Sequence, residues 1–597
     1  MRLDYKWRAA IVVAIGLFMG VLDNTIVSVA LPQMQAYFHT DRDTITWVGT
    51  AYFLAQAAII PITGYLSDRI GSKTVFVSAL AIFTLGSVMC AFAPSEQFLI
   101  AFRVFQGIGG GALFPTAFAI IFRIFPPAER GPAGAVIGVP VLLAPAFGPT
   151  IGGYFTTSFD WRAIFLINLP VGIVALILSA LVLRGGAAER TASGELTGEE
   201  PRDRGHFDVV GLALSMLGFT SLVYGVSRAA QTSWSDRPVQ ITLIAGGVLL
   251  VAFIINELLV SDPVMDVRLF LNYTFTVSNM LLWVVSGFLF ASLFLLPVFF
   301  QNVQGNSPLQ SGEYVIVQGL GAAVATVISG RLYNRVGPRW LAAIGFALVT
   351  AGTFGLTQLQ PNTAWQSLQG WLVLRGLGLG FTNIPLQTLA LSVVSNRAMA
   401  RASSLVNVTR QVFGAVGITV LTTIFVQQAK DNAATYTPQV TAAAQTYVQQ
   451  QVQTATQQAV AAYTAGSPLD PTSPLGHLAA TCAQPYGATA AHHTAQIQAC
   501  VQQMTSQYAQ SFAQQYAAQH GHDLAAQFAA QYVQQHVLPA ATTYGLNAAF
   551  VISMIGCAVA VVLALFVGRD PAVEAVKRAA ARGEAPAAVP QPALVGE

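Results

Sequence analysis

Fourteen apolar runs of roughly 20 residues divide this chain, and they constrain its fold more than any other feature. A run of that length, wound as a helix, crosses the hydrocarbon core of a lipid bilayer. Charged residues make up only 9% of the 597 residues, whereas soluble domains hold about 25%. Too few charges remain to cover the surfaces of several soluble domains. The sequence therefore predicts an all-α polytopic membrane protein.

The predicted spans are numerous enough to account for most of the chain. They cover 9–31, 45–65, 75–94, 97–121, 132–156, 161–183, 208–229, 239–258, 272–300, 310–330, 339–360, 365–393, 403–427 and 541–567. The basic N-terminus and the first run superficially resemble a signal peptide. That run lacks a small-residue cleavage site and carries Asp23, so we interpret it as a retained first span.

The basic residues set the expected orientation. An even number of spans puts both termini on the same side of the membrane. Of the 29 Lys and Arg residues, 21 lie on the side of the termini and five on the opposite side. Because basic residues concentrate in cytoplasmic loops, we expect both termini in the cytoplasm and a multi-pass protein of the cell (inner) membrane.

Three polar segments lie outside the spans. Residues 184–207 are charged and contain Gly, which indicates a cytoplasmic linker, and 568–597 form a tail that we expect to be disordered. Residues 428–540 are rich in Gln, Ala, Thr and Tyr and are expected on the extracytoplasmic side of the membrane. Aromatic residues four apart within 506–537 favour an amphipathic helix, so we expect a helical hairpin, with disorder as the alternative.

Two of the four cysteines lie in this outer insertion. Cys482 and Cys500 share the oxidising side of the membrane, so we expect a disulfide between them. The histidines of the insertion match no ligand spacing, and the chain carries no phosphate loop or nucleophile elbow. We therefore expect no catalytic site, no metal site and no cofactor.

Two pairs of segments recur in the two parts of the chain. "GYLSDRIGSKTVF" (64–76) has a weaker copy in "GRLYNRVGPRWLA" (330–342), and "RVFQGIGGGALFP" (103–115) resembles "RGLGLGFTNIPLQ" (375–387). Corresponding loops in two halves are typical of the parallel repeats of major facilitator transporters.

Five motifs in order carry a closer resemblance. They are "LDNTIVSVALP", "GYLSDRIGSK", "RVFQGIGGG", "APAFGPTIGG" and "WRAIFLINLPVG". With fourteen spans, they make the chain similar to the fourteen-helix drug/proton antiporters of the major facilitator superfamily (EmrB/QacA type). The resemblance implies a secondary transporter rather than an enzyme. It implies one six-helix half at 1–183, two extra helices at 208–258 and a second half at 272–427 with 541–567.

The first repeated loop is the expected gate. Its informative residues are Gly64, Asp68, Arg69, Gly71 and Lys73. Asp68 ends a helix, so it can pair with basic groups of neighbouring helices and latch the cytoplasmic end closed. The alternative is that the basic residues here only follow the orientation rule. The second copy has Asn334 in place of Asp68, so the two halves should not gate equally.

Charges within the spans are the expected coupling site. Asp23 and Arg103 are costly in a bilayer unless paired or hydrated, and Gln106 lies one turn after Arg103. We expect Asp23 to carry the proton and Arg103 to modulate it; the alternative is a permanent structural pair. "GIGGGA" could be taken for a dinucleotide fingerprint, but no strand precedes it, and close helix packing explains its glycines.

A Pro/Gly-rich helix is the expected moving element. Its residues are Pro145, Gly148, Pro149, Gly152 and Gly153. Such a helix can bend and admit a close neighbour. The resemblance associates this motif with antiporters, which implies export. Glu313 and Arg410 lie nearer the ends of their spans and are secondary candidates for the cavity or the proton path.

The sequence thus predicts a proton-coupled multidrug efflux antiporter that exports amphipathic compounds, cationic or lipophilic, by alternating access. Its expected partners are small-molecule substrates, protons and the bilayer; we expect no nucleic acid and a monomer, with an extracytoplasmic adaptor or cargo partner left open. A second hypothesis is export of a lipid or secreted metabolite assisted by 428–540. A third is a membrane-anchored sensor or scaffold, which leaves Asp23 and Arg103 unexplained.

Overall fold

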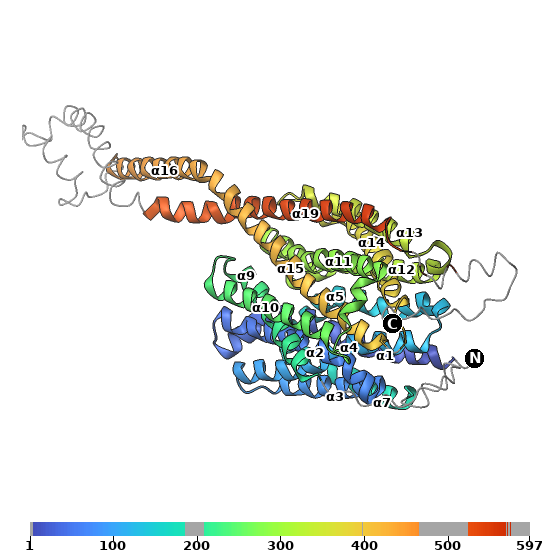
Figure 1. The fold of residues 1–597 in the computed structure, drawn as a ribbon. Helices are drawn as coiled ribbons and strands as arrows, with labels where there is room; N and C mark the ends of the chain where they lie inside the picture. The colour runs from blue at the N-terminus through green and yellow to red at the C-terminus, as the bar shows by residue number, and fades with distance from the viewer. Residues whose placement is uncertain are drawn as a thin grey trace, which may run out of the picture. The chain divides into compact units, whose positions relative to one another are not determined.

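The structure, a computed structural model, describes residues 4–184, 208–396, 398–464, 523–568, 570 and 574. Every regular element in these ranges is a helix (Figure 1), which confirms the predicted all-α class. The chain forms two compact units, Met1–Gln427 with Thr543–Glu597, and Gln428–Thr542. Cys482, Cys500 and nearly all of the predicted linker and tail lie outside the described residues.

The first part of the larger unit contains seven helices built from the first six predicted spans. They are α1 (Tyr5–Phe38), α2 (Arg42–Ile70), α3 (Ser72–Ala91), α4 (Glu96–Ile124), α5 (Arg130–Ser158), α6 (Ala163–Leu166) and α7 (Asn168–Val182). The sixth span is divided between α6 and α7. Pro170 lacks the N–H that would bond the carbonyl of Leu166, so the helix is interrupted there and α7 begins at Asn168.

The remaining long helices of this unit follow in the predicted order. They are α9 (Val209–Gln231), α10 (Arg237–Leu259), α11 (Tyr273–Val298), α12 (Pro308–Val336), α13 (Pro338–Phe354), α14 (Trp365–Ser392), α15 (Met399–Thr435) and α19 (Leu538–Ala564). The last residues of α15 and the first of α19 belong to the smaller unit. α9 and α10 pack against each other, and α9 also packs against α2.

Thirteen of the described helices are long and apolar enough to cross a membrane, one fewer than the predicted fourteen spans. The difference is α14, which is 28 residues long but is not among the thirteen. α14 packs against α11, α12, α13 and α5, and it buries Arg375, Asn383 and Gln387. A helix enclosed by other helices needs less apolar surface than one that faces lipid. By contrast, α10 exposes a row of aliphatic side chains.

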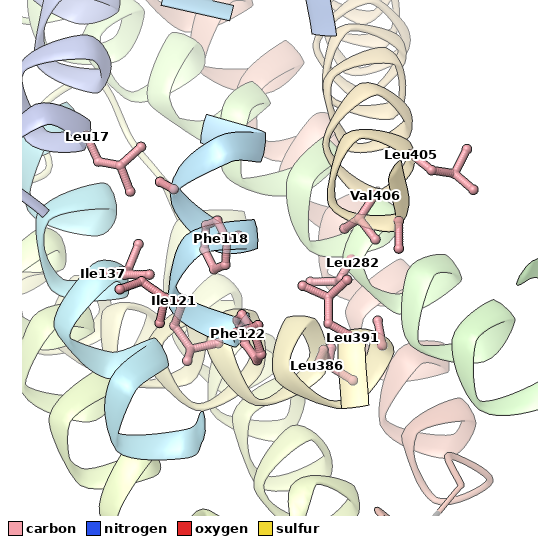
Figure 2. Close-up of a cluster of buried hydrophobic side chains, with 14 of the residues drawn as sticks. Leu17, Phe118, Ile121, Phe122, Ile137, Leu282, Leu386, Leu391, Leu405 and Val406 are labelled. Atoms are coloured by element: carbon pink, nitrogen blue, oxygen red, sulfur yellow. The ribbon is translucent and has the colours of Figure 1, made fainter. Parts of the chain in front are cut away.

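The core of the larger unit joins its two halves. Figure 2 shows Phe118 and Phe122 of α4 near Leu386 of α14 and Val406 of α15. These side chains are at most 2% exposed and belong to one cluster. Gly64 of α2 lies so close to α15 that a Cβ added to it would sit 2.8 Å from the Ala400 carbonyl and the Arg401 Cα. The first and second halves are therefore in direct contact at this end of the bundle.

In the smaller unit, the described parts of the insertion are also helical. α16 (Thr437–Thr464) is followed, after residues outside the described ranges, by helix from Asp523. The Tyr447 ring stacks on the Phe528 ring with centroids 4.5 Å apart. Phe528 and Tyr532, one helical turn apart, have ring centroids 5.7 Å apart. The aromatic stripe predicted for this segment thus pairs its helix with α16.

Candidate functional site

Asp23 lies at the centre of a buried polar cluster within the first half. Its carboxylate is fully buried. Arg103 donates from Nη1 to Oδ2 at 2.5 Å, and Gln106 donates from Nε2 to Oδ1 at 3.0 Å. Asn168 donates from Nδ2 to the same Oδ1 at 2.9 Å. We call Asp23, Arg103, Gln106 and Asn168 the Asp23 site; it joins α1, α4 and α7.

The guanidinium of Arg103 has acceptors besides the carboxylate. Its Nε donates to the Val48 carbonyl at 3.1 Å, and its Nη1 also donates to Gln106 Oε1 at 2.7 Å. The Tyr52 ring lies beneath it, with the Arg103 Cζ 4.0 Å from the ring centroid. A buried guanidinium with two neutral acceptors and an aromatic face is less dependent on its carboxylate than one paired with the carboxylate alone.

Asn168 is the member of this site that the sequence did not predict. It lies in the motif "WRAIFLINLPVG", which contributes to the family resemblance but to none of the predicted sites. The interruption before α7 places Asn168 at the start of that helix, where it also donates to Ser87 Oγ at 3.1 Å. An Asn within an apolar span was the signal that could have identified it.

The predicted gating loop forms a second charged cluster at one end of the bundle. Asp68 accepts from Arg123 Nη2 at 2.7 Å and from Arg401 Nε at 3.0 Å. Arg401 also pairs through Nη2 with Asp262 at 2.8 Å. We call Asp68, Arg123, Arg401 and Asp262 the Asp68 cluster. Since Arg123 belongs to the first half and Arg401 to the second, Asp68 ties the halves together.

The other loop residues have local roles. Gly71 connects α2 to α3 with a φ of 90°, which side-chain-bearing residues rarely adopt. Lys73 donates to the Ala180 carbonyl at 2.8 Å, and the Arg69 guanidinium lies 4.8 Å from the Tyr65 ring centroid.

The second copy of the loop differs as its sequence suggested. Asn334 donates to the backbone carbonyl of Ala128 at 2.5 Å, a neutral contact in place of an ion pair. The preceding residue, Tyr333, donates to Asp570 at 2.8 Å. The two halves therefore contact each other here through different chemistry.

The predicted bending helix is one continuous α5 with three internal prolines, Pro140, Pro145 and Pro149. Its glycines admit neighbouring helices. A Cβ added to Gly148 would lie 2.0 Å from Thr25 Oγ1 of α1, and one added to Gly152 would lie 2.9 Å from the Ile26 carbonyl. One added to Gly153 would lie 3.2 Å from Leu309 of α12. Thus α5 packs tightly between α1 of the first half and α12 of the second.

The two secondary candidates differ sharply. Glu313 is exposed near the start of α12 and is a member of neither the Asp23 site nor the Asp68 cluster. Arg410 of α15 is only 7% exposed. It donates from Nη1 to Gln387 Oε1 at 2.8 Å and from Nε to Ser286 Oγ at 3.3 Å. Within the described residues it forms no ion pair, and those residues hold no group of three or more His, Cys, Asp or Glu that could bind a metal.

The comparisons with known proteins now decide the family. The sequence profile of the Major Facilitator Superfamily matches residues 13–418. The chain belongs to the major facilitator superfamily. As the sequence predicted, it is a multi-pass membrane transporter of small molecules and not an enzyme.

Several relatives are named for multidrug resistance or export. The chain is 37% identical to a multidrug resistance protein B homolog of Mycobacterium tuberculosis (strain ATCC 25618 / H37Rv), over 70% of this chain and 76% of the relative. It is 30% identical to the multidrug export protein EmrB of Escherichia coli K12, over 70% and 79%. The resemblance to this drug transporter family is therefore confirmed. The human transporter MFSD10 shares the fold, with a TM-score of 0.51 at 17% identity over 71% of this chain and 94% of that one.

Proposed function

We propose that this transporter is a proton-coupled antiporter that exports amphipathic compounds from the cytoplasm. In this proposal both termini lie in the cytoplasm of a cell with an inner membrane, the protein acts as a monomer, and substrate enters from the cytoplasm or the inner leaflet. The Asp68 cluster then closes the cytoplasmic end, and substrate leaves on the outer side. The buried Asp23–Arg103 pair is the observation that carries the proposal.

Proton binding at Asp23 has a defined consequence for its neighbours. A neutral Asp23 no longer holds Arg103 by charge, but Arg103 retains the Val48 carbonyl and Gln106 Oε1 as acceptors. The cost of breaking the ion pair is thereby reduced. Because Asp23 joins α1 to α4 and α7, its protonation loosens contacts among three helices. That is the link between a proton and a conformational change that antiport requires.

The proton gradient supplies the energy in this scheme. Moving one charge across the membrane potential provides about 2.3 kcal/mol per 100 mV. Asp23 is buried in the described conformation, so a proton reaches it only when the transporter opens around it. Proton and substrate therefore bind in alternating states, which prevents uncoupled leakage of protons.

The experiment measures export of a lipophilic fluorescent dye from proteoliposomes under an imposed pH gradient. We expect wild-type protein to export dye only when the gradient is present. Asp23→Asn should reduce gradient-driven export at least tenfold, and Asp23→Glu should recover part of it. Asp43→Asn serves as the matched control, because it makes the same change at an exposed residue in the first turn of α2, outside the Asp23 site. If Asp23→Asn still couples dye export to the gradient, Asp23 is not the proton carrier.

A further inference from the structure

Within the described residues, Arg410 is a buried cation without a counter-ion. Between Tyr273 and Gln427 the sequence holds seven arginines and one carboxylate, Glu313, which is exposed on α12. Arg103 in the first half is balanced by Asp23, whereas Arg410 is held by two neutral side chains, Gln387 and Ser286. An unpaired charge buried in a membrane protein is expensive and is a functional-site hypothesis by default.

Several N–H groups of Arg410 and of the side chains near it have no hydrogen-bond acceptor in the described residues. A guanidinium carries five N–H donors, and the bonds to Gln387 and Ser286 use two, leaving three without an oxygen acceptor in the described residues. Arg410 fixes the orientation of the Gln387 amide, because only its oxygen can accept from Nη1. The Gln387 Nε2 is then buried without a partner, and so is the Nδ2 of Asn383 one turn away on the same face of α14.

The position of Arg410 suits a transported ligand. It lies eleven residues after the start of α15, about 16 Å along the helix, because α15 begins four residues before the predicted span; Arg410 is therefore farther from the helix end than the sequence indicated. Its Cζ is 6.0 Å from the centroid of the Phe114 ring of α4, and the next residue, Gln411, donates to the Phe53 carbonyl of α2 at 3.3 Å. Arg410 therefore lies where the second half meets the first, the location of substrate sites in this type of transporter.

Arg375, the other unpaired arginine within a span of the second half, is less suited to bind a ligand. Its guanidinium donates to Ser292 Oγ and to the Phe288 carbonyl, both on α11 of the same half. It is 1% exposed and has no such contact with the first half. Arg375 therefore holds α14 to α11, whereas Arg410 faces the interface that opens during transport.

We propose that Arg410, Gln387 and Asn383 bind the anionic group of the transported compound, so that the substrates include amphipathic monoanions such as aryl carboxylates. The guanidinium fork matches the two oxygens of a carboxylate, and the Phe114 ring offers an apolar face for the aromatic portion. This inference rests on the proposed export function and names its substrate class. It differs from the cationic substrates expected from the sequence, because Arg103 already neutralises Asp23.

The test measures ligand binding by the purified full-length protein in nanodiscs of zwitterionic lipid, with 1-pyrenebutyrate and its methyl ester as matched probes. Fluorescence titrations are corrected for partitioning into empty nanodiscs. We expect wild-type protein to bind the carboxylate at least about tenfold more tightly than the ester, the scale of one charge-assisted hydrogen bond. Arg410→Gln should reduce this preference to less than twofold, and Arg410→Lys should retain part of it.

The matched control is Arg331→Gln, which removes the same charge from an exposed position on α12 and should leave the preference unchanged. Unchanged ester binding in Arg410→Gln confirms that the variant is folded. If it does not fold, Asn383→Leu serves instead and should weaken binding of the carboxylate more than of the ester.

Equal binding of both probes by wild type, or a preference that survives Arg410→Gln, overturns the inference. Binding needs no proton gradient, so a preference for the carboxylate can be observed even if gradient-driven dye export fails and the proposed function is wrong. If dye export is gradient-driven but the protein shows no preference for the carboxylate, only the inference about Arg410 is refuted.

Discussion

Replacing Asp68 by alanine should favour opening of the end of the bundle that the Asp68 cluster closes in the proposed cycle. Asp68 makes two charge-assisted hydrogen bonds, and they affect the opening differently. The bond to Arg123 lies within the first half, so it persists in the open and closed states. The bond to Arg401 joins the halves, so in the proposed cycle it exists only when the cytoplasmic end is closed. Only the second bond changes the equilibrium between the two states.

The size of the shift follows from that bond. The side chains of Asp68 and Arg401 are each 5% exposed, so solvent screens their interaction little. A hydrogen bond to a charged group contributes about 1.5–3 kcal/mol, and each 1.4 kcal/mol changes an equilibrium constant by about tenfold. Asp68→Ala should therefore raise the open fraction by about 10- to 100-fold. Arg401 keeps Asp262, which holds it near its present position.

The assay uses a cysteine as a reporter of opening. Ser404 is fully buried on α15 and its Oγ would lie 2.8 Å from a Cβ on Gly64, so Ser404→Cys is accessible only when the halves separate. In purified protein with the four native cysteines replaced by serine, the rate of labelling by a charged maleimide measures the open fraction. The labelling rate should rise about 10- to 100-fold in Asp68→Ala.

Two matched variants separate the contributions. Arg401→Gln should increase labelling of Ser404→Cys to a similar degree, because it removes the contact between the halves. Arg123→Gln removes the other, shorter bond from the same carboxylate but should leave labelling within about twofold of the parent protein, because that bond is common to both states. Equal labelling in Asp68→Ala and the parent, or a similar increase in Arg123→Gln, would show that the latch reasoning is wrong.

Two further predictions concern packing and the insertion. Gly148→Val should lower the melting temperature of the purified protein by several degrees, because its side chain would collide with Thr25, whereas Gly247→Ala, with no atom within 4 Å of the added Cβ, should change it by less than about one degree. Replacing residues 436–537 by a short Gly/Ser linker should preserve dye export if the larger unit alone transports. Loss of export from a folded deletion variant would favour the second hypothesis, cargo guidance by the insertion.

Much of the fold could be predicted, because a membrane-crossing helix is recognised in the sequence by the length of its apolar run. The interruption between α6 and α7 was not predicted, because the apolar run is continuous in composition and Pro170 near a helix start is compatible with an unbroken span. Conversely, α14 was predicted as one of the fourteen apolar runs, although it is not among the thirteen helices that are long and apolar enough to cross a membrane.

The candidate site was only partly predictable. Asp23 and Arg103 were evident because charges are rare within spans, and their proximity follows from the packing of α1 against α4. The pairing of Asp68 with Arg401 was not predictable to the residue, because 333 positions separate them and many arginines share that side. The lack of a carboxylate at Arg410 likewise becomes visible only when the neighbours of its side chain are known.

The burial of α14 also bears on how the protein is made. A helix that carries Arg375, Asn383 and Gln387 partitions poorly into lipid by itself as it leaves the ribosome. Its main partners α11, α12 and α13 precede it in the chain, and α11 supplies the Ser292 hydroxyl and the Phe288 carbonyl that receive the Arg375 guanidinium. Because α11 is synthesised first, its hydrogen-bond acceptors are already in place when α14 leaves the ribosome. Insertion of α14 therefore depends on its packing against helices made earlier. Mutations that disrupt α11 should accordingly alter the membrane orientation of the segments that follow.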